Sequence, residues 1–400
     1  MKTVTLREIT LNITDGKHGD CEPAENSGYY FVSCKDVNNG TIDYANARQI
    51  SERAFLETHK RTQLEPNDIL ITNSGTIGRM ALVKDIPETY RTTFQKSVAI
   101  VKPDISVVLP TYLYYKLQNC VTDFVNCSNG SAQKNLLLGT MRKFQIDLHE
   151  DFAQQERLSS ILAAYDNLIE NNQKQIKLLE EAARRLYKEW FVDLRFPGYE
   201  DTPIVDGVPE GWEEAPIDSR ISLLSGYAFK SAQFDSSGEY KIVTIKNVKD
   251  GEFDGINTNR IVSIPGKTPK HCVLTDGDIL LSLTGNVGRT CIVNGNNYLL
   301  NQRIAKLQSD IPAFTYCLFR SSDMFDAMNN LANGTAQQNL SPIRTGKISI
   351  LFPADNLLEK FERIVGSMIS KMLSLIKQCD LLIQARDRLL PKLMSGEIEV

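Results

Sequence analysis

The sequence predicts an α+β protein in which two similar, mostly β domains are separated by two long antiparallel coiled-coil helices, with a pseudo-two-fold internal repeat. Three observations predict this fold. Four segments recur in order, short apolar runs alternate with Gly, Asn and Asp in each copy, and each copy is followed by a long heptad pattern. The expected parts are a first domain (1–150), a first helix (151–196), a linker (197–210), a second domain (211–353) and a second helix (354–400).

The duplication is visible in four pairs of segments, at offsets of 211, 210, 207 and 204 residues. They are Lys35–Gly40 with Lys246–Gly251, Asp68–Arg79 with Asp278–Arg289, Gln95-Lys96 with Gln302-Arg303, and Asn129–Leu136 with Asn333–Leu340. The offset shrinks in one direction, as small deletions in a diverged duplication would produce. We therefore expect one fold used twice.

Each copy combines strands with a little helix. Short apolar runs such as 68–71 and 240–245 are bounded by turn residues, which is typical of strands. Apolar residues at helical spacing predict a helix near 110–126 and its counterpart near 313–331.

Each domain is followed by a helix whose seam residues alternate steps of four and three. The first seam comprises Leu158, Leu162, Tyr165, Ile169, Asn172, Ile176, Leu179, Ala183, Leu186 and Trp190. The second comprises Phe361, Val365, Met368, Met372, Leu375, Cys379, Leu382, Arg386, Leu389 and Leu393, each 203 residues after its counterpart. We expect the seams to pack on each other, with Asn172 and Arg386 setting the register. The alternative at these two positions is a frayed, solvated stretch.

Charge and cysteine content set limits on function. The net charge is −4, but residues 1–150 carry 17 basic and 17 acidic side chains and residues 211–353 carry 14 and 13, so the acid excess lies in the helical middle. Any nucleic-acid surface must then be a local basic patch, or a partner must supply the remaining positive charge. The eight cysteines include no Cys-x-x-Cys pair, so we expect reduced thiols and no metal site. No signal peptide or membrane-spanning run is apparent, which predicts a cytoplasmic protein.

No catalytic motif stands out. The chain has no Pro-Pro dipeptide of the kind found in amino-methyltransferase loops, and Pro265–Thr268 lacks the first glycine of a phosphate-binding loop. No Glu-x-Lys of a nuclease follows Asp68 or Asp278 closely, and no Gly-x-Ser-x-Gly elbow is present. These absences favour binding over catalysis, and we assign no catalytic residue.

The candidate binding residues lie in the repeated segments. Paired glycines after a strand let a backbone approach a phosphate, and a following arginine suits a phosphate or a guanine edge. The first-domain candidates are Lys35, Ser74, Gly75, Thr76, Gly78, Arg79, Gln95, Lys96, Gln133 and Lys134. The second-domain candidates are Lys246, Thr284, Gly285, Asn286, Gly288, Arg289, Gln302, Arg303, Gln337 and Gln338. A tight turn is the alternative for the glycine pairs, and a solvated surface position is the alternative for Lys35 and Lys246.

Taken together, these features resemble the specificity subunits of type I restriction-modification enzymes. The resemblance spans essentially the whole chain. Its motifs are the two-copy plan, Lys35–Gly40, Ser74–Arg79, Val208–Trp212, Leu186–Val192 and the terminal Leu389–Ile398.

The resemblance implies a DNA-recognition subunit without catalysis of its own. Each outer domain would be a target-recognition domain that reads one half of a bipartite site in double-stranded DNA. Two modification subunits, which bind S-adenosylmethionine and methylate adenine N6, would dock on the helices. Restriction subunits would supply translocation and cleavage with ATP and Mg²⁺, so no cofactor would belong to this chain. The two copies differ at Asn73 against Leu283 and at Lys134 against Gln338, which predicts two different half-sites.

Two other functions remain open. The helices could serve an interaction scaffold whose outer domains bind protein, or the Gly-x-x-Gly loops could bind RNA, as the backbone-clamping loop of KH domains does. Specific DNA binding weakens steeply with salt, whereas a scaffold would not respond, and competition with single-stranded RNA separates the third function.

The helices also predict a mechanical role. A stiff helix pair would hold two readers at a fixed separation, so helix length should set the unspecified gap between half-sites. We expect an insertion or deletion of four residues in the helices to change the preferred gap by one or more base pairs, read from the footprint on DNA. An unchanged footprint would contradict this.

Overall fold

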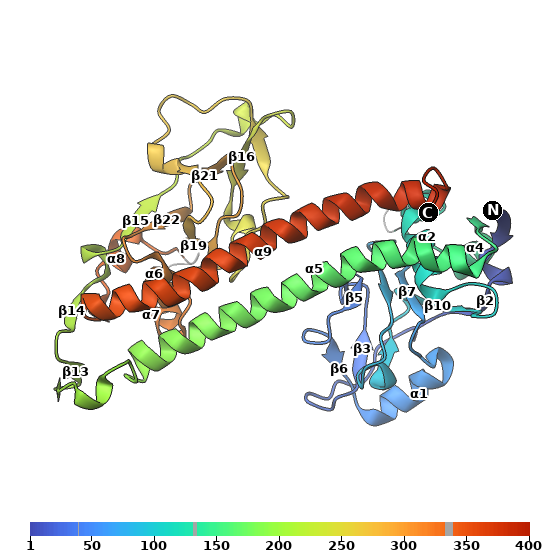
Figure 1. Ribbon diagram of the computed structural model, residues 1–400, viewed down its shortest axis with the longest axis horizontal. Coiled ribbons are helices and arrows are strands. Elements are labelled where there is room, and N and C mark those ends of the chain that lie inside the picture. Colours follow the sequence, from blue (N-terminus) through green and yellow to red (C-terminus); the bar gives the residue numbers. More distant parts are fainter. Residues whose placement is uncertain (39, 131–133, 333–338) are drawn as a thin grey trace. The chain divides into compact units, whose positions relative to one another are not determined.

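The computed structural model of the chain describes residues 1–38, 40–130, 134–332 and 339–400 (Figure 1). The chain divides into two compact units. The first unit comprises Met1–Leu168 with Leu382–Val400, and the second comprises Ile169–Leu381. Each unit thus contains one copy of the repeated domain and a part of each long helix. The predicted α+β fold with an internal repeat and two long helices is confirmed.

The first unit is built, within its described residues, on a four-stranded antiparallel sheet. In sheet order the strands are β2 (Thr10–Asp15), β10 (Val98–Pro103), β7 (Ile69–Thr72) and β8 (Met80–Leu82). The smaller strands are β6 (Arg48–Gln49), β3 (Tyr30–Val32) and β9 (Thr92–Phe94) in one sheet, with the pairs β1 (Lys2–Thr5) and β11 (Gln145–Leu148), and β4 (Val37–Asn38) and β5 (Thr41–Ile42). Every residue of β7 is buried, which explains its continuous apolar run.

The second unit repeats this plan in its described residues. Its central sheet is β15 (Ser222–Ser225), β22 (Ile304–Gln308), β19 (Ile279–Ser282) and β20 (Thr290–Ile292). The second sheet is β17 (Asn259–Ile261), β16 (Tyr240–Val243), β21 (Tyr298–Leu300) and β18 (Val273–Leu274), and β14 (Glu213–Pro216) pairs with β23 (Ser349–Phe352). The central sheets share strand order, directions and register, since Leu70 pairs with Ile100 as Leu280 pairs with Lys306. One fold is therefore used twice.

The helices within the domains are more broken than the sequence pattern predicts. The expected helix near 110–126 consists of α2 (Pro110–Asn119) and α3 (Val121–Asn126), and its counterpart consists of α6 (Pro312–Phe319) and α7 (Ser322–Ala332). The hydroxyl of Ser321 accepts a hydrogen bond from the N–H of Met324 at 3.3 Å. A side chain in this position caps a new helix, so α7 starts afresh after α6 ends. The remaining short helices are α1 (Glu52–Thr62), α4 (Leu138–Lys143) and α8 (Pro342–Gly346).

The two long helices are α5 (Phe152–Tyr187) and α9 (Asp355–Ser395). A π-helical turn over Lys188–Val192 continues α5, and the expected linker contains the short hairpin of β12 (Ile204–Val205) and β13 (Val208–Pro209). Gly396 follows α9 with a φ of 78°, in the left-handed conformation that commonly ends a helix. The second helix therefore ends before residue 400, the expected boundary.

Within the second unit, α5 and α9 pack antiparallel. The Asn172 amide donates to Oε1 of Gln378 at 3.4 Å, and the ring of Tyr187 lies against the ring of Phe361 with centroids 6.3 Å apart. Residue numbers rise along one helix as they fall along the other. Asn172 is 6% exposed and contacts the partner helix, so the seam interpretation of this residue is confirmed and the solvated alternative is excluded.

Within the first unit, the seam contains a polar contact between the same two helices. Nη1 of Arg386 donates to Oδ1 of Asp166 at 2.6 Å, and the hydroxyl of Tyr115 on α2 donates to Oδ2 of Asp166 at 2.6 Å. Burial and the charge of Asp166 raise the pKa of Tyr115, so the phenol stays protonated as a donor. We call these three residues the seam triad. Arg386 thus contacts the other long helix, while its role in setting the register stays a prediction.

Each domain core is continuous with the helix seam of its own unit. In the first unit, Leu162 of α5 and Leu393 of α9 belong to the same buried cluster as Tyr112 of α2. In the second unit, Tyr187 of α5 and Phe361 of α9 cluster with Phe314 of α6 and with Trp190. All the predicted seam residues are buried or half-buried, as the heptad pattern predicts.

We predict that the seam triad stabilises the first unit through coupling rather than through independent contacts. Arg386→Ala leaves the Asp166 carboxylate without its cation and should lower the free energy of unfolding in urea by about 1–3 kcal/mol. The double variant Asp166→Ile/Arg386→Ala installs Ile369 and Ala183, the residues 203 positions away in the other copy, and should lose less than the sum of its two single variants. Arg363→Ala, at an exposed α9 position, is the control and should change stability by about 0.5 kcal/mol or less. Additive losses would contradict the coupling.

Candidate nucleic-acid interface

The repeated segments of the first unit meet at one end of its central sheet. The N–H of Asn73 donates to the carbonyl of Ser97 at 3.0 Å, and the N–H of Leu136 donates to the carbonyl of Asn73 at 2.8 Å. The N–H of Cys34 donates to the hydroxyl of Ser97 at 3.2 Å. We call these segments, 33–36, 73–79, 95–97 and 134–136, the first loop cluster.

The second unit assembles its own loop cluster in the same way. The N–H of Leu283 donates to the carbonyl of Arg303 at 2.9 Å, and the N–H of Leu340 donates to the carbonyl of Leu283 at 2.7 Å. A Cβ atom on Gly285 would lie 3.5 Å from Cδ1 of Ile245, which places the turn that carries Lys246 beside the glycine loop. The second loop cluster comprises 244–247, 283–289, 301–303 and 339–340. The sequence repeat thus predicted which segments come together.

The glycine loops are tight turns between two strands. Gly78 has a φ of 90° and donates its N–H to the carbonyl of Thr72 at 2.9 Å, and a Cβ atom there would lie 2.6 Å from Cγ1 of Val121. Turn geometry and packing therefore account for Gly78, as the alternative interpretation proposed. Gly75 differs, because it is exposed, has a φ of 79°, and would place a Cβ atom at 3.5 Å from Cys34, an ordinary contact. Gly285 of the second copy is likewise exposed, with a φ of 73°, so the first glycine of each loop leaves its backbone open to a ligand.

Lys35 and Lys246 lie on a second recurring turn. The carboxylate of Asp36 accepts from both the N–H and the hydroxyl of Ser33 at 2.8 Å. In the second unit, the Asn247 amide oxygen accepts from the N–H and hydroxyl of Thr244 at 2.8 and 2.9 Å. These side-chain bonds explain why the repeated element begins with Lys-Asp or Lys-Asn. The two lysines are exposed beside the glycine loops, where a ligand can reach them.

One predicted match between the copies is wrong by one residue. The N–H of Lys96 donates to the carbonyl of Lys17 at 3.1 Å, and the N–H of Gln302 donates to the carbonyl of Tyr227 at 2.9 Å. Lys17 and Tyr227 each lie two positions beyond the end of an equivalent strand, β2 or β15. Lys96 therefore corresponds to Gln302, and Ser97 corresponds to Arg303. The earlier alignment of Lys96 with Arg303 followed charge, whereas backbone hydrogen bonds set the register. Arg303 also has a φ of 74°, an unusual conformation for a non-glycine residue.

The candidate side chains divide by exposure. The exposed ones in the clusters are Lys35, Thr76, Arg79, Lys96, Lys134, Lys246, Asn286, Gln302 and Arg303. Gln95, Ser74 and Arg289 are half-buried, and Thr284 is buried. Gln133, Gln337 and Gln338 lie outside the described residues. The cations of the first loop cluster, Lys35, Arg79, Lys96 and Lys134, form no ion pair with a described residue, so their charges are available to an anionic ligand.

The acidic residues that begin the repeated strand are structural. The carboxylate of Asp68 lies 2.8 Å from Nζ of Lys102, and that of Asp278 lies 2.8 Å from Nζ of Lys306. Burial raises the pKa of Asp68 although the lysine opposes the shift. Both carboxylates also accept a backbone N–H from the turn before their strand, which explains their recurrence without any catalytic role.

Sequence reasoning missed a cavity of about 370 Å³ at the edge of the first loop cluster. Its polar lining residues are Asp15, His18, Asn73, Ser74, Lys96 and Asn135. Ser74 and Lys96 were predicted, but Asp15 and His18 lie in no repeated motif. The sequence signal that could have found this cavity was the difference between Asn73 and Leu283. One copy has a polar residue and the other an apolar residue at the end of an otherwise repeated strand. We call this space the sheet-end cavity.

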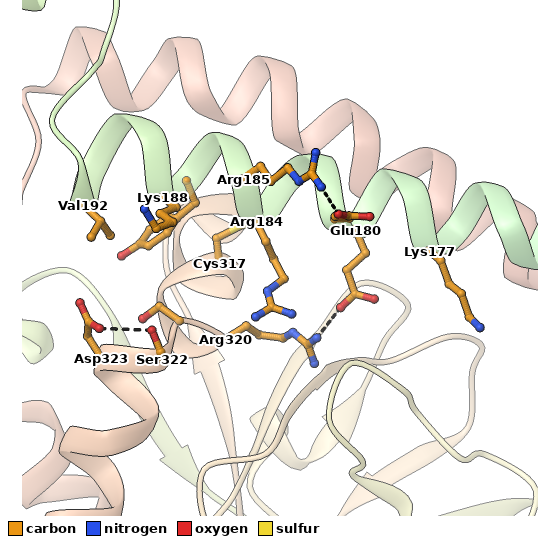
Figure 2. A pocket seen from close by; sticks show the side chains of 13 residues that line it. Lys177, Glu180, Arg184, Arg185, Lys188, Val192, Cys317, Arg320, Ser322 and Asp323 are labelled. Atoms are coloured by element: carbon orange, nitrogen blue, oxygen red, sulfur yellow. Dashed lines mark hydrogen bonds and ion pairs between the residues drawn. The ribbon is translucent and has the colours of Figure 1, made fainter. Parts of the chain in front are cut away.

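A second cavity, of about 490 Å³, lies in the second unit between α5 and the junction of α6 with α7 (Figure 2). Its charged lining residues are Lys177, Glu180, Glu181, Arg184, Arg185, Lys188, Arg320 and Asp323. Arg320, whose side chain is 5% exposed, pairs with Glu180 at 2.6 Å. Arg184 points from α5 toward Arg320 in Figure 2 and has no ion-pair partner among the described residues. We call this space the helix cavity; its lining has an excess of positive charge.

The described residues offer no metal centre. None of their His, Cys, Asp and Glu side chains gather in groups of three or more that could hold an ion. All eight cysteines are free, and burial raises the pKa of the Cys317 thiol to about 12, so it is an unreactive neutral group. In the part of the chain that the structure describes, no helix has the length and apolar character needed to cross a membrane.

Comparison with known proteins decides the family. The family model described as "Type I restriction modification DNA specificity domain" matches residues 15–181 and 209–364, once in each copy of the repeat. The chain belongs to this family. The resemblance inferred from the sequence motifs is thereby confirmed.

Two curated relatives align with the chain over most of their length. The MjaIX specificity subunit of Methanocaldococcus jannaschii is 26% identical over 391 residues, covering 92% of this chain and 87% of the relative. The HindI specificity subunit of Haemophilus influenzae is 21% identical over 467 residues, covering 99% of each chain. The crystal structure of a type I restriction-modification S subunit from M. genitalium has the same fold, with a TM-score of 0.59 at 14% identity over 98% of this chain and 95% of that one.

Proposed function

We propose that this chain is the DNA-recognition subunit of a type I restriction-modification complex, in which each loop cluster contacts one half of a bipartite site. The observation that carries the proposal is the loop cluster itself, assembled twice by equivalent backbone hydrogen bonds in a chain of the specificity family. Unpaired cations in such a cluster suit phosphates, and sequence is read through base edges. The differences between the copies support two different half-sites.

The chain contributes recognition and no chemistry. The recurring carboxylates Asp68 and Asp278 are ion-paired with lysines, and the buried Cys317 thiol is neutral. S-adenosylmethionine would belong to two modification subunits that methylate adenine, and ATP and Mg²⁺ would belong to restriction subunits. The protein scaffold and RNA-binding functions remain alternatives, and neither is favoured by a specific contact in the structure.

The helix cavity supports a docking place for a modification subunit. Arg184 is exposed and unpaired at its edge, while Glu180 and Glu181 are neutralised by Arg320 and Arg185. Opposite charges across an interface accelerate association and exclude wrong partners. An acidic side chain of the modification subunit would therefore pair with Arg184.

We predict that duplex DNA binds this chain with steep salt dependence. A complex that contacts six to ten phosphates loses about 10³–10⁵ in affinity between 50 and 200 mM salt.

Methylated adenines should be mapped in the DNA of cells that carry this chain with its modification subunits. The map should show one bipartite sequence of two unlike halves with a constant gap. Salt-independent binding would favour the protein scaffold, and stronger competition by single-stranded RNA than by duplex would favour the RNA-binding alternative.

We predict that Arg184→Glu weakens the affinity for the modification subunit by about 10-fold or more, because it puts like charges at the contact. Titration of the labelled full-length chain with the modification subunit measures this. Lys371→Glu makes the same charge change at an exposed α9 position outside the cavity and should bind normally. Direct DNA binding by the Arg184 variant should be unchanged. Equal affinities for both variants would remove the helix cavity from the docking surface.

A further inference from the structure

Asn73, which lines the sheet-end cavity, has a side-chain oxygen that the described residues leave unpaired. Asn73 is 4% exposed, and its Oδ1 is buried with no hydrogen-bond partner among the described residues. Its backbone is fully engaged, since its N–H bonds Ser97 and its carbonyl bonds Leu136. A buried amide oxygen without a donor costs about 1–3 kcal/mol, so such a group calls for an explanation.

A second acceptor lines the same cavity. The side chain of Asp15 is 10% exposed, and its carboxylate is held by the Arg61 guanidinium on one side and by Nε2 of His18 at 3.3 Å on the other. An ionised carboxylate has about four lone-pair positions, so these two contacts leave acceptor capacity free. Asp15 and Asn73, whose side chains have acceptor capacity left, line the cavity together, and the exposed Lys96 lines it from the 95–97 segment.

The second copy shows that the fold does not require this polarity. The register of the central sheets places Ser225 at the position of Asp15, because Ser225 pairs with Ala305 as Asp15 pairs with Ala99. Leu283 replaces Asn73, is 5% exposed, and packs in the apolar core of its unit. The same backbone thus accepts an aliphatic side chain. Asp15 is already held by Arg61 and His18, but the unpaired oxygen of Asn73 needs a reason other than folding.

We infer that the sheet-end cavity reads a base that carries an exocyclic amino group, adenine or cytosine, in the half-site bound by the first domain. Oδ1 of Asn73 and the carboxylate of Asp15 accept from the amino group, and Lys96 contacts the adjoining phosphate. In the major groove, Asn pairs with adenine, and Asp or Glu accepts from N4 of cytosine. Thymine and guanine present only acceptors or a methyl group on their major-groove edges, so they cannot donate to these oxygens. The inference rests on the proposed function and adds a specificity-determining contact to it.

The test is selection from a randomised duplex library by the full-length chain with its modification subunits. Asn73→Leu, which installs the residue of the second copy, should lower the discrimination for A or C over T or G at one position of one half-site by about 10-fold, because the acceptor is gone. The other half-site should be unchanged. Asn73→Asp keeps an acceptor and should keep the preference for an amino-bearing base.

Three further variants complete the test. Leu283→Asn is the matched control in the second domain and should leave the first half-site as in wild type. Lys96→Gln, the residue of the second copy, should weaken binding to all sequences alike and lower the salt slope by about 1. Asn73→Ala removes the acceptor without adding bulk and replaces Asn73→Leu if that variant melts well below wild type.

The outcomes separate the inference from the function that it rests on. A wild-type chain that selects no bipartite site refutes the proposed function. A wild-type chain that selects one, together with Asn73→Leu or Asn73→Ala variants that select the same first half-site with the same discrimination, overturns the inference alone. Loss of the amino-base preference in Asn73→Asp would overturn it as well.

Discussion

The constraint on which each unit depends is that its β domain and its helix seam share one apolar core. Phe314 of α6 contacts Tyr187 and Phe191 of the α5 end, with ring centroids 5.6 and 5.2 Å apart, and Phe361 of α9 packs on the same rings. The domain and the helices cannot fold as independent layers when one aromatic cluster belongs to both. Loss of one such side chain would therefore loosen the helix pair and the sheet together, since large buried residues contribute about 1.5–3 kcal/mol each. The loop cluster of each unit is placed by the same core, because the strands that end in the clusters lie in it.

The two units pack their long helices with different kinds of residues at matched positions. In the first unit, Lys116 of α2 is buried and donates to the carbonyl of Met394 at 2.6 Å, near the end of α9. Burial lowers the pKa of Lys116, which shows the desolvation cost of this contact. The seam triad lies nearby, whereas the second unit has apolar residues where Asp166 and Arg386 stand. Polar groups at seam positions favour one pairing over others at some loss of stability. Because the first unit has polar residues where the second has apolar ones, each helix segment fits the packing of its own unit better than the packing of the other unit.

The sequence was most informative where a pattern repeats. The recurring turns of Asp36 and Asn247, the strand ends at Thr72 and Ser282, and the heptad seam were all predictable because their spacing reflects backbone geometry. The sequence was less informative where a tertiary contact decides. A continuous helical pattern hid the break between α2 and α3, and the similarity of two charged dipeptides obscured the register that pairs Lys96 with Gln302. The sheet-end cavity was not predictable from motifs, because Asp15 ends β2 and Asn73 follows β7, and the two residues line one cavity only through the β2–β10–β7 order of the sheet.

The same comparison separates what a recurring residue does from what a differing residue does. Gly78 and Gly288 recur because each turn has a positive φ and little room for a Cβ atom, with side-chain atoms 2.6 and 3.2 Å away. Their recurrence reports the scaffold, and substitution would strain the turn in either domain. Asn73 and Leu283 differ at a position where the backbone bonds are the same in both copies, so no demand of the fold explains the difference. Recurring glycines such as these identify demands of the shared fold, whereas the difference between Asn73 and Leu283 identifies a position where the same backbone accepts side chains of unlike polarity.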